Sequence, residues 1–254
     1  MNFTTKTAML ATALSALTTF SARAQVPAGW AATNYQATDI AVGKNGAVWT
    51  INQEVSYQVN AGMRPWPWPA SRMAVGPDGT PWIIDTLHRV MFFNGSGFVP
   101  TKSGVWDGKT WAPYTGNDIG IGANGWIWII GTDSYPYWWD GRAFNKFVGL
   151  GVKISVGPDG KPWVVTGAGT IFQWTGSLPA VGYPIQGAWK QYPGWASDIS
   201  VGPDGTVYVV GGSNVIYRWN GTGWVNEGVA GPAIAAGAGL HAWLARAGAT
   251  VITR

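Results

Sequence analysis

Short apolar runs separated by glycine-containing turns repeat along most of the chain. The clearest example is SDISVGPDGTVYVV, residues 197–210, in which two apolar and largely β-branched segments flank Gly202-Pro203-Asp204-Gly205. β-Branched residues favour strands, and a proline followed by aspartate and glycine favours a tight turn. The pattern therefore predicts a β-hairpin over this stretch.

The same pattern occurs six times, with an aromatic residue after each turn. The turns begin at Gly43, Gly76, Gly122, Gly157, Gly202 and Gly237, at steps of 33 to 46 residues. A second hairpin follows each copy and is clearest in residues 215–228, where two strands flank Asn220-Gly221. Repeats of this length built from strands are typical of propellers and solenoids. Four strands per repeat predict an all-β, six-bladed β-propeller of four-stranded blades.

The two ends of the chain are predicted to share the last blade. The sixth copy ends at Val251-Ile252-Thr253-Arg254, without the fourth strand that its repeat requires. Residues 29–33 have no hairpin partner before them. We therefore expect this N-terminal strand to complete the last blade and close the ring, because closure removes exposed sheet edges.

Residues 1–24 have the features of a secretory signal peptide. They combine Lys6, an apolar run over residues 8–20 and the small-residue pattern Ala22-Arg23-Ala24. The propeller domain is then expected over residues 25–254, secreted to the periplasm or the cell exterior. The apolar run is too short to span a bilayer, and no other segment approaches that length.

Composition narrows the function classes. The net charge is +4 and falls to +2 without the predicted signal peptide, which is too small and too scattered for a nucleic-acid surface. The chain has no cysteine, so disulfides and thiol chemistry are excluded. Of the 18 tryptophans, those that follow the six turns are expected, with the equivalent tyrosine, mostly to pack between blades. No motif predicts a metal or another cofactor.

Acidic residues precede the first strand in alternate copies. They are Asp39, Asp118 and Asp198, whereas the other three copies have Arg72, Lys153 and Ala233 near this position. Two interpretations remain open. The carboxylates hydrogen-bond to backbone at the start of each blade, or they form three similar sites that bind sugar hydroxyls or an ion. In the second case each site also contains an aromatic residue three or four positions earlier: Tyr35, Tyr114 and Trp195.

A proline–tryptophan run connects the first two predicted blades. It reads Pro65-Trp66-Pro67-Trp68-Pro69, and alternating proline is predicted to prevent regular strand pairing and to favour an extended connection. Trp66 and Trp68 either fill the space between blades or form an exposed platform for the apolar face of a sugar ring.

The repeated pattern D-I-x-V-G-x-D/N-G-x-V-W, followed by I-Y-x-W-N-G, resembles the tectonin repeat. The resemblance extends over residues 29–254 and is clearest in copies 1, 3 and 5. It implies a secreted, non-catalytic lectin that binds cell-surface glycans such as lipopolysaccharide or methylated sugars. No binding residue is transferred from it, because the motif residues define the fold.

Two other functions are considered. The VGPDGTV string also resembles streptogramin-lyase propellers, which are enzymes that need a cluster of histidine and glutamate. Here His88, His241, Glu54 and Glu227 fall in four different repeats. The second alternative is a non-catalytic scaffold or adhesion propeller in a surface assembly, with a protein partner or another copy of the chain bound to it.

Overall fold

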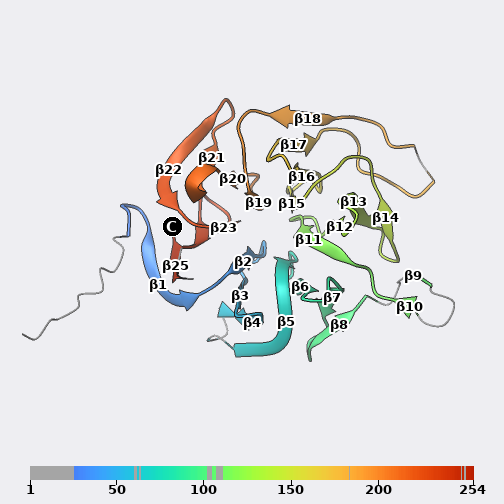
Figure 1. Ribbon diagram of the computed structural model, residues 1–254, viewed down its shortest axis with the longest axis horizontal. Coiled ribbons are helices and arrows are strands. Elements are labelled where there is room, and N and C mark those ends of the chain that lie inside the picture. Colours follow the sequence, from blue (N-terminus) through green and yellow to red (C-terminus); the bar gives the residue numbers. More distant parts are fainter. Residues whose placement is uncertain are drawn as a thin grey trace, which may run out of the picture.

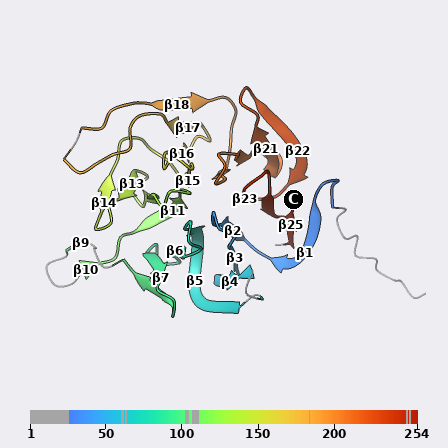
Figure 2. The ribbon, with the colours of Figure 1, turned by 180° about the vertical axis from the view of Figure 1, so that it is seen from behind.

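The computed structural model describes residues 26–59, 62, 64–101, 105–106, 111–182, 184–246, 248 and 250–254. The predicted signal peptide lies outside the described residues. Those residues form an all-β propeller, with strands arranged around a central axis (Figures 1 and 2). Helical structure among them is confined to short 3-10 segments such as Gly212–Asn214. None of the described segments is a helix long and apolar enough to cross a bilayer.

Four sheets of the described chain contain four strands each. The first has β11 (Gly116–Ile121), β12 (Ile127–Gly131), β13 (Pro136–Trp139) and β14 (Phe144–Lys146); the second has β15 (Lys153–Val156), β16 (Pro162–Val165), β17 (Ile171–Trp174) and β18 (Trp189–Tyr192). The third has β19 (Asp198–Val201), β20 (Val207–Val210), β21 (Val215–Trp219) and β22 (Trp224–Ala230); the fourth has β23 (Ala233–Ala236), β24 (Ala242–Ala245), β25 (Thr250–Thr253) and β1 (Ala31–Gln36).

The remaining long sheet has seven strands, where separate blades were predicted. Its strands are β2 (Asp39–Val42), β3 (Val48–Asn52), β4 (Val55–Gln58), β5 (Arg64–Val75), β6 (Pro81–Asp85), β7 (Val90–Phe93) and β8 (Phe98–Pro100). The sheet is continuous because β5 pairs with β4 through its first half and with β6 through its second half. A short pair, β9 (Val105–Trp106) and β10 (Trp111–Ala112), stands apart.

The proline–tryptophan run pairs with β4, but the register shifts within it, so the pairing is not regular. Pro65 pairs with Tyr57, and Trp66 pairs with Ser56, within β5. Prolines at every second position all lack the N–H on the same side of the strand. The other side stays free to form hydrogen bonds, so the run can pair on one side.

The predicted hairpins are confirmed. In the copy over residues 197–210, β19 pairs with β20, and the Gly202 N–H donates to the Thr206 carbonyl at 2.8 Å. Gly205 closes the turn at φ 87°, which is why glycine stands there. The first two strands pair in the same way in the other five copies.

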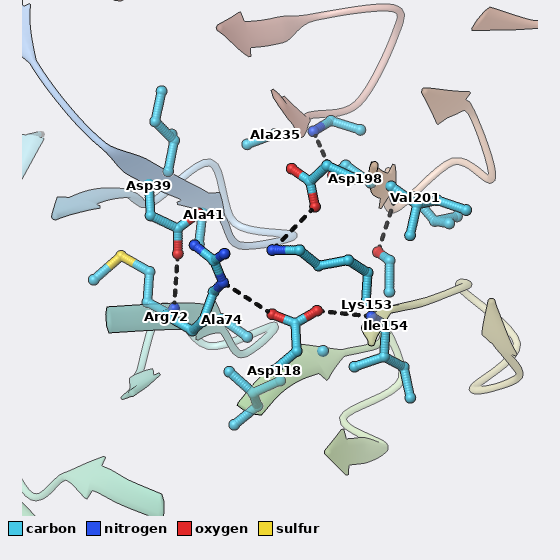
Figure 3. A pocket seen from close by; sticks show the side chains of 18 of the residues that line it. Asp39, Ala41, Arg72, Ala74, Asp118, Lys153, Ile154, Asp198, Val201 and Ala235 are labelled. Atoms are coloured by element: carbon cyan, nitrogen blue, oxygen red, sulfur yellow. Dashed lines mark hydrogen bonds and ion pairs between the residues drawn. The ribbon is translucent and has the colours of Figure 1, made fainter. Parts of the chain in front are cut away.

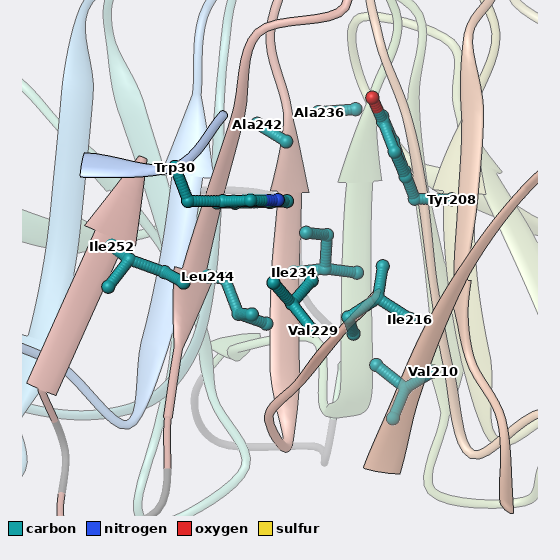
Figure 4. Packing of buried hydrophobic residues seen from close by; sticks show 10 residues of the cluster. All are labelled: Trp30, Tyr208, Val210, Ile216, Val229, Ile234, Ala236, Ala242, Leu244 and Ile252. Carbon is teal, nitrogen blue, oxygen red and sulfur yellow. The ribbon is translucent and has the colours of Figure 1, made fainter. Parts of the chain in front are cut away.

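The core lies between neighbouring sheets. Trp49, Trp128, Trp163 and Tyr208, each from the second strand of a repeat, are all buried there, which confirms the packing interpretation for these four aromatics. Trp30 occupies one such cluster with Leu244 and Ile252 (Figure 4). It directly precedes β1, which pairs antiparallel with β25 through Ala31 and Thr253. The first and last described strands therefore belong to one sheet.

Candidate functional site

The inner strands of the repeats surround a charged cavity of about 80 Å³. Five charged side chains line it, as Figure 3 shows: Asp39, Arg72, Asp118, Lys153 and Asp198. They lie on the inner strands, which are β2, β5, β11, β15 and β19. Each pairs with the residue twelve positions later in the next strand, so all five hold the same register. A one-residue strand shift would turn these side chains away from the axis, so the repeated register brings the charges together.

Two of the carboxylates tie one repeat to the next. Asp39 Oδ2 accepts a hydrogen bond from the Met73 N–H at 3.0 Å, and Asp118 Oδ2 accepts one from the Ile154 N–H at 2.7 Å. The backbone-bonding interpretation is therefore confirmed for these two residues, and each of these bonds reaches the following repeat.

The two cations each reach the carboxylate of the following repeat. Arg72 Nε lies 3.6 Å from Asp118 Oδ1, and Lys153 Nζ lies 3.8 Å from Asp198 Oδ1. In the described part of the chain Asp39 has no ion-pair partner. The charged ring, meaning the five charged side chains around the cavity, thus contains three carboxylates and two cations.

Burial changes the protonation of these carboxylates. Desolvation raises the pKa of Asp39 to about 7, although Arg72 and Lys153 act in the opposite direction. Desolvation also raises the pKa of Asp198 to about 6, against the lowering effect of Lys153. The pKa of Asp118 is raised for the same reason.

The stability of the protein is expected to depend on the charge of Asp39. Because its pKa is higher in the folded state, its contribution is fully present below about pH 4 and is lost as the pH rises through about 7. Asp39→Asn should therefore gain stability over the parent between pH 4 and pH 8. The pKa shift sets a limit of roughly 4 kcal/mol, and the water-accessible cavity reduces the expected gain to roughly 1–2 kcal/mol.

Urea titrations at pH 4, 6 and 8 measure this gain. Asp78→Asn is the control, because hydrogen bonding from the Thr80 backbone lowers the pKa of Asp78. The stability that Asp78 contributes is lost as the pH falls. Asp78→Asn should therefore be less stable than the parent at pH 6 and 8, which is the opposite of the expected effect of Asp39→Asn. If the free energy of unfolding changed with pH in the same way for the parent and for Asp39→Asn, the raised pKa of Asp39 would be contradicted.

The structure does not assemble three separate aspartate–aromatic pairs. The three aspartates share one cavity, and its described lining residues include no aromatic. Tyr35 packs against Trp243 with ring centroids 6.4 Å apart, and Tyr114 packs against Phe144 at 5.1 Å. The sequence spacing was misleading because the aspartates face the axis while these tyrosines pack between sheets.

The remaining predicted aromatics lie in different surroundings. Trp195 is 53% exposed and covers Gly169, where an added Cβ would overlap its ring. Trp66 packs against Phe93 with centroids 4.7 Å apart, which confirms the packing interpretation for this residue. Trp68 is 39% exposed beside Gly97. A joint Trp66–Trp68 platform is therefore not formed.

An apolar groove that sequence reasoning missed lies between the sheets β11–β14 and β15–β18. It has a volume of about 400 Å³ and is lined by Tyr135, Gly149, Leu150, Val164, Thr166, Phe172 and Trp189. The lining residues are dispersed along the chain, so no motif marks them. The available indication was the apolar loop Val148-Gly149-Leu150-Gly151-Val152, since connecting loops are usually polar.

Two aromatic rings are fixed at the groove. Trp189 Nε1 donates to the Val148 carbonyl at 2.9 Å, and Gly149 lies so close that a Cβ there would be 2.7 Å from Nε1. On Tyr135, Lys146 Nζ lies 3.5 Å from the ring centroid. The same ammonium group lies 2.9 Å from Asp133 Oδ2, so charged groups stand beside the aromatic lining.

The histidines and glutamates of different repeats are not all separate, because His241 and Glu227 both contact Arg254. His88 Nδ1 lies 3.3 Å from the Gly116 carbonyl oxygen, and His241 Nδ1 lies 2.8 Å from that of Arg254. Glu227 pairs with Arg218 and Arg254. Among the described residues, no three or more His, Cys, Asp or Glu side chains are grouped so that they could hold one metal ion together.

No model of a known protein family and no curated protein matches the chain. Solved structures match it at low identity. A gluconolactonase from Xanthomonas campestris is 10% identical over 86% of this chain and 85% of its own, with a TM-score of 0.62. The WD40 repeats of RRP9 are 11% identical over 88% of this chain and 82% of their own, with a TM-score of 0.58. Streptogramin B lyase is 15% identical over 88% of this chain and 97% of its own, with a TM-score of 0.55.

These similarities show a β-propeller fold and nothing finer. The matched proteins include two named as enzymes and one named for WD40 repeats, so the fold does not select a function. The resemblance to tectonin repeats stays a prediction.

Proposed function

We propose that this protein is a secreted, non-catalytic lectin that binds cell-surface glycans in the apolar groove between β11–β14 and β15–β18. The observation that supports this proposal is the pairing of fixed aromatic rings with adjacent charged groups. Sugar-binding sites need such a combination, because an aromatic ring covers the apolar face of a sugar while polar groups orient its hydroxyls.

The residues of the groove can be given these roles. Tyr135 and Trp189 supply aromatic surface, and Thr166 supplies a hydroxyl inside the groove. Lys146 and Asp133 offer a donor and an acceptor beside Tyr135. The groove of about 400 Å³ is within the size range of small-ligand sites.

The proposal includes six blades on a closed ring. The seven-stranded sheet counts as two blades joined through β5, and β1 counts as the outer strand of the last blade. The common register of the six inner strands supports this division. Such a ring is a rigid support for binding loops. Membership of the tectonin-repeat family, with lipopolysaccharide or methylated sugars as ligands, is part of the same proposal.

A protein-binding scaffold is the second candidate function. It is favoured by the apolar side chains beside the groove, because Val148, Leu150 and Val152 are each at least 41% exposed. Contiguous exposed apolar surface is typical of protein interaction sites.

Binding of glycans to the parent and to groove variants distinguishes the two functions. A glycan array, with and without chelator, selects the sugar, and calorimetry then measures the affinity of Tyr135→Ala and Leu150→Ser. We expect each to bind about tenfold more weakly, which corresponds to about 1.4 kcal/mol. Leu87→Ser is the matched control, because Leu87 is a similarly exposed leucine outside the groove.

Unchanged glycan affinity in both groove variants would show that glycans bind outside the groove. The absence of binding to every glycan, together with a folded parent, would contradict the lectin function and favour the scaffold.

A further inference from the structure

The charged cavity has a threefold arrangement with one member missing. Acidic residues occupy the first, third and fifth repeats, and Arg72 and Lys153 occupy the second and fourth. In the sixth repeat the same register, opposite Ala245, is held by Ala233. Each cation contacts the carboxylate of the following repeat. A cation at position 233 would by the same rule reach Asp39.

Position 233 is well placed for that role. Ala233 packs in the same apolar cluster as Ile40, the neighbour of Asp39, so the sixth repeat directly adjoins the first. Asp39 uses Oδ2 to accept the Met73 N–H, and no described residue forms an ion pair with it. The other two carboxylates have Arg72 and Lys153 as partners. Asp39 is therefore the carboxylate without an ion pair of its own, and Arg72, the cation that influences it most strongly, already pairs with Asp118.

We propose that the cavity binds a small monovalent cation, an ammonium group or an alkali-metal ion, beside Asp39. The charge of the site favours this class of ligand. Three carboxylates and two cations leave one negative charge when all are ionised, and a single positive charge neutralises it. The nearby Arg72 and Lys153 disfavour a divalent ion, because each repels it.

The size of the cavity sets an upper limit on the ligand. A volume of about 80 Å³ has room for an ion with one or two waters, or for a primary ammonium group, since a water occupies about 30 Å³ in the liquid. A quaternary ammonium ion is too bulky and presents no N–H donor to a carboxylate. The proposal does not depend on the groove, so glycan binding and cation binding can fail separately.

Thermal unfolding with matched salts tests the site. At pH 8 and equal concentration, methylammonium chloride should raise the Tm of the parent above that in tetramethylammonium chloride by about 2 °C or more. Parallel arms with ammonium, potassium and sodium chloride distinguish an amine site from an alkali-metal site. A parent that responds equally to every salt would overturn the proposal.

Two variants locate the effect. Asp39→Asn removes the charge, and Ala233→Lys supplies the missing cation at the position equivalent to Lys153; both should abolish the difference between the salts. The control Ala238→Lys adds the same charge at an exposed turn, where the first repeat has Lys44, and should keep the difference. Retention of the difference in Asp39→Asn would overturn the proposal, even if Ala233→Lys failed to fold.

Discussion

Trp30→Ala is expected to lower the free energy of unfolding by about 3–5 kcal/mol, because it truncates a large buried aromatic and leaves a cavity. Trp30 is only 8% exposed and packs with Leu244 and Ile252 beside the β1–β25 pair. Urea titration should show a lower midpoint at an unchanged slope.

Trp195→Ala is the matched control for this prediction. Trp195 is 53% exposed and belongs to none of the buried clusters of the described residues, so its truncation should cost about 1 kcal/mol or less. If Trp30→Ala unfolded at the parent's midpoint, the packing of the N-terminal segment on the last sheet would contribute nothing to stability.

Trp128→Ala is expected to have an effect of the same size, about 3–5 kcal/mol. The side chain is 0% exposed and packs against Phe147 with ring centroids 5.1 Å apart. Its Nε1 also donates to the Gly160 carbonyl at 3.1 Å, which connects two neighbouring sheets. Truncation removes both the packing against Phe147 and the hydrogen bond to Gly160. Urea titration measures their combined contribution to the free energy of unfolding.

Substitution by phenylalanine separates the hydrogen bond from the packing. Trp49 occupies the equivalent position in the first repeat, is 2% exposed, and its Nε1 has no hydrogen-bond partner among the described residues. Trp128→Phe should therefore cost about 1 kcal/mol more than Trp49→Phe, the typical net value of one hydrogen bond. Equal costs would show that the bond to Gly160 contributes nothing.

The hairpins could be predicted from the sequence because their causes are local. Pro203, Asp204 and Gly205 set the turn through their own backbone preferences, and the flanking β-branched residues favour strands without reference to the rest of the chain. The same local argument did not predict the pairing of Pro65 and Trp66, because this pairing depends on a partner strand, β4, that the linker sequence does not contain.

The sequence by itself determined the repeats, the turns and the recurrence of Asp39, Asp118 and Asp198 at one register. Only the tertiary structure decided which side chains meet. The three carboxylates converge with Arg72 and Lys153 in one cavity because the inner strands surround a common axis, although these residues are 33 or more positions apart in sequence. Tyr135 and Trp189 likewise line one groove because neighbouring sheets pack face to face. Packing between sheets brings together residues that are far apart in the sequence, so it cannot be predicted from the spacing of neighbouring residues.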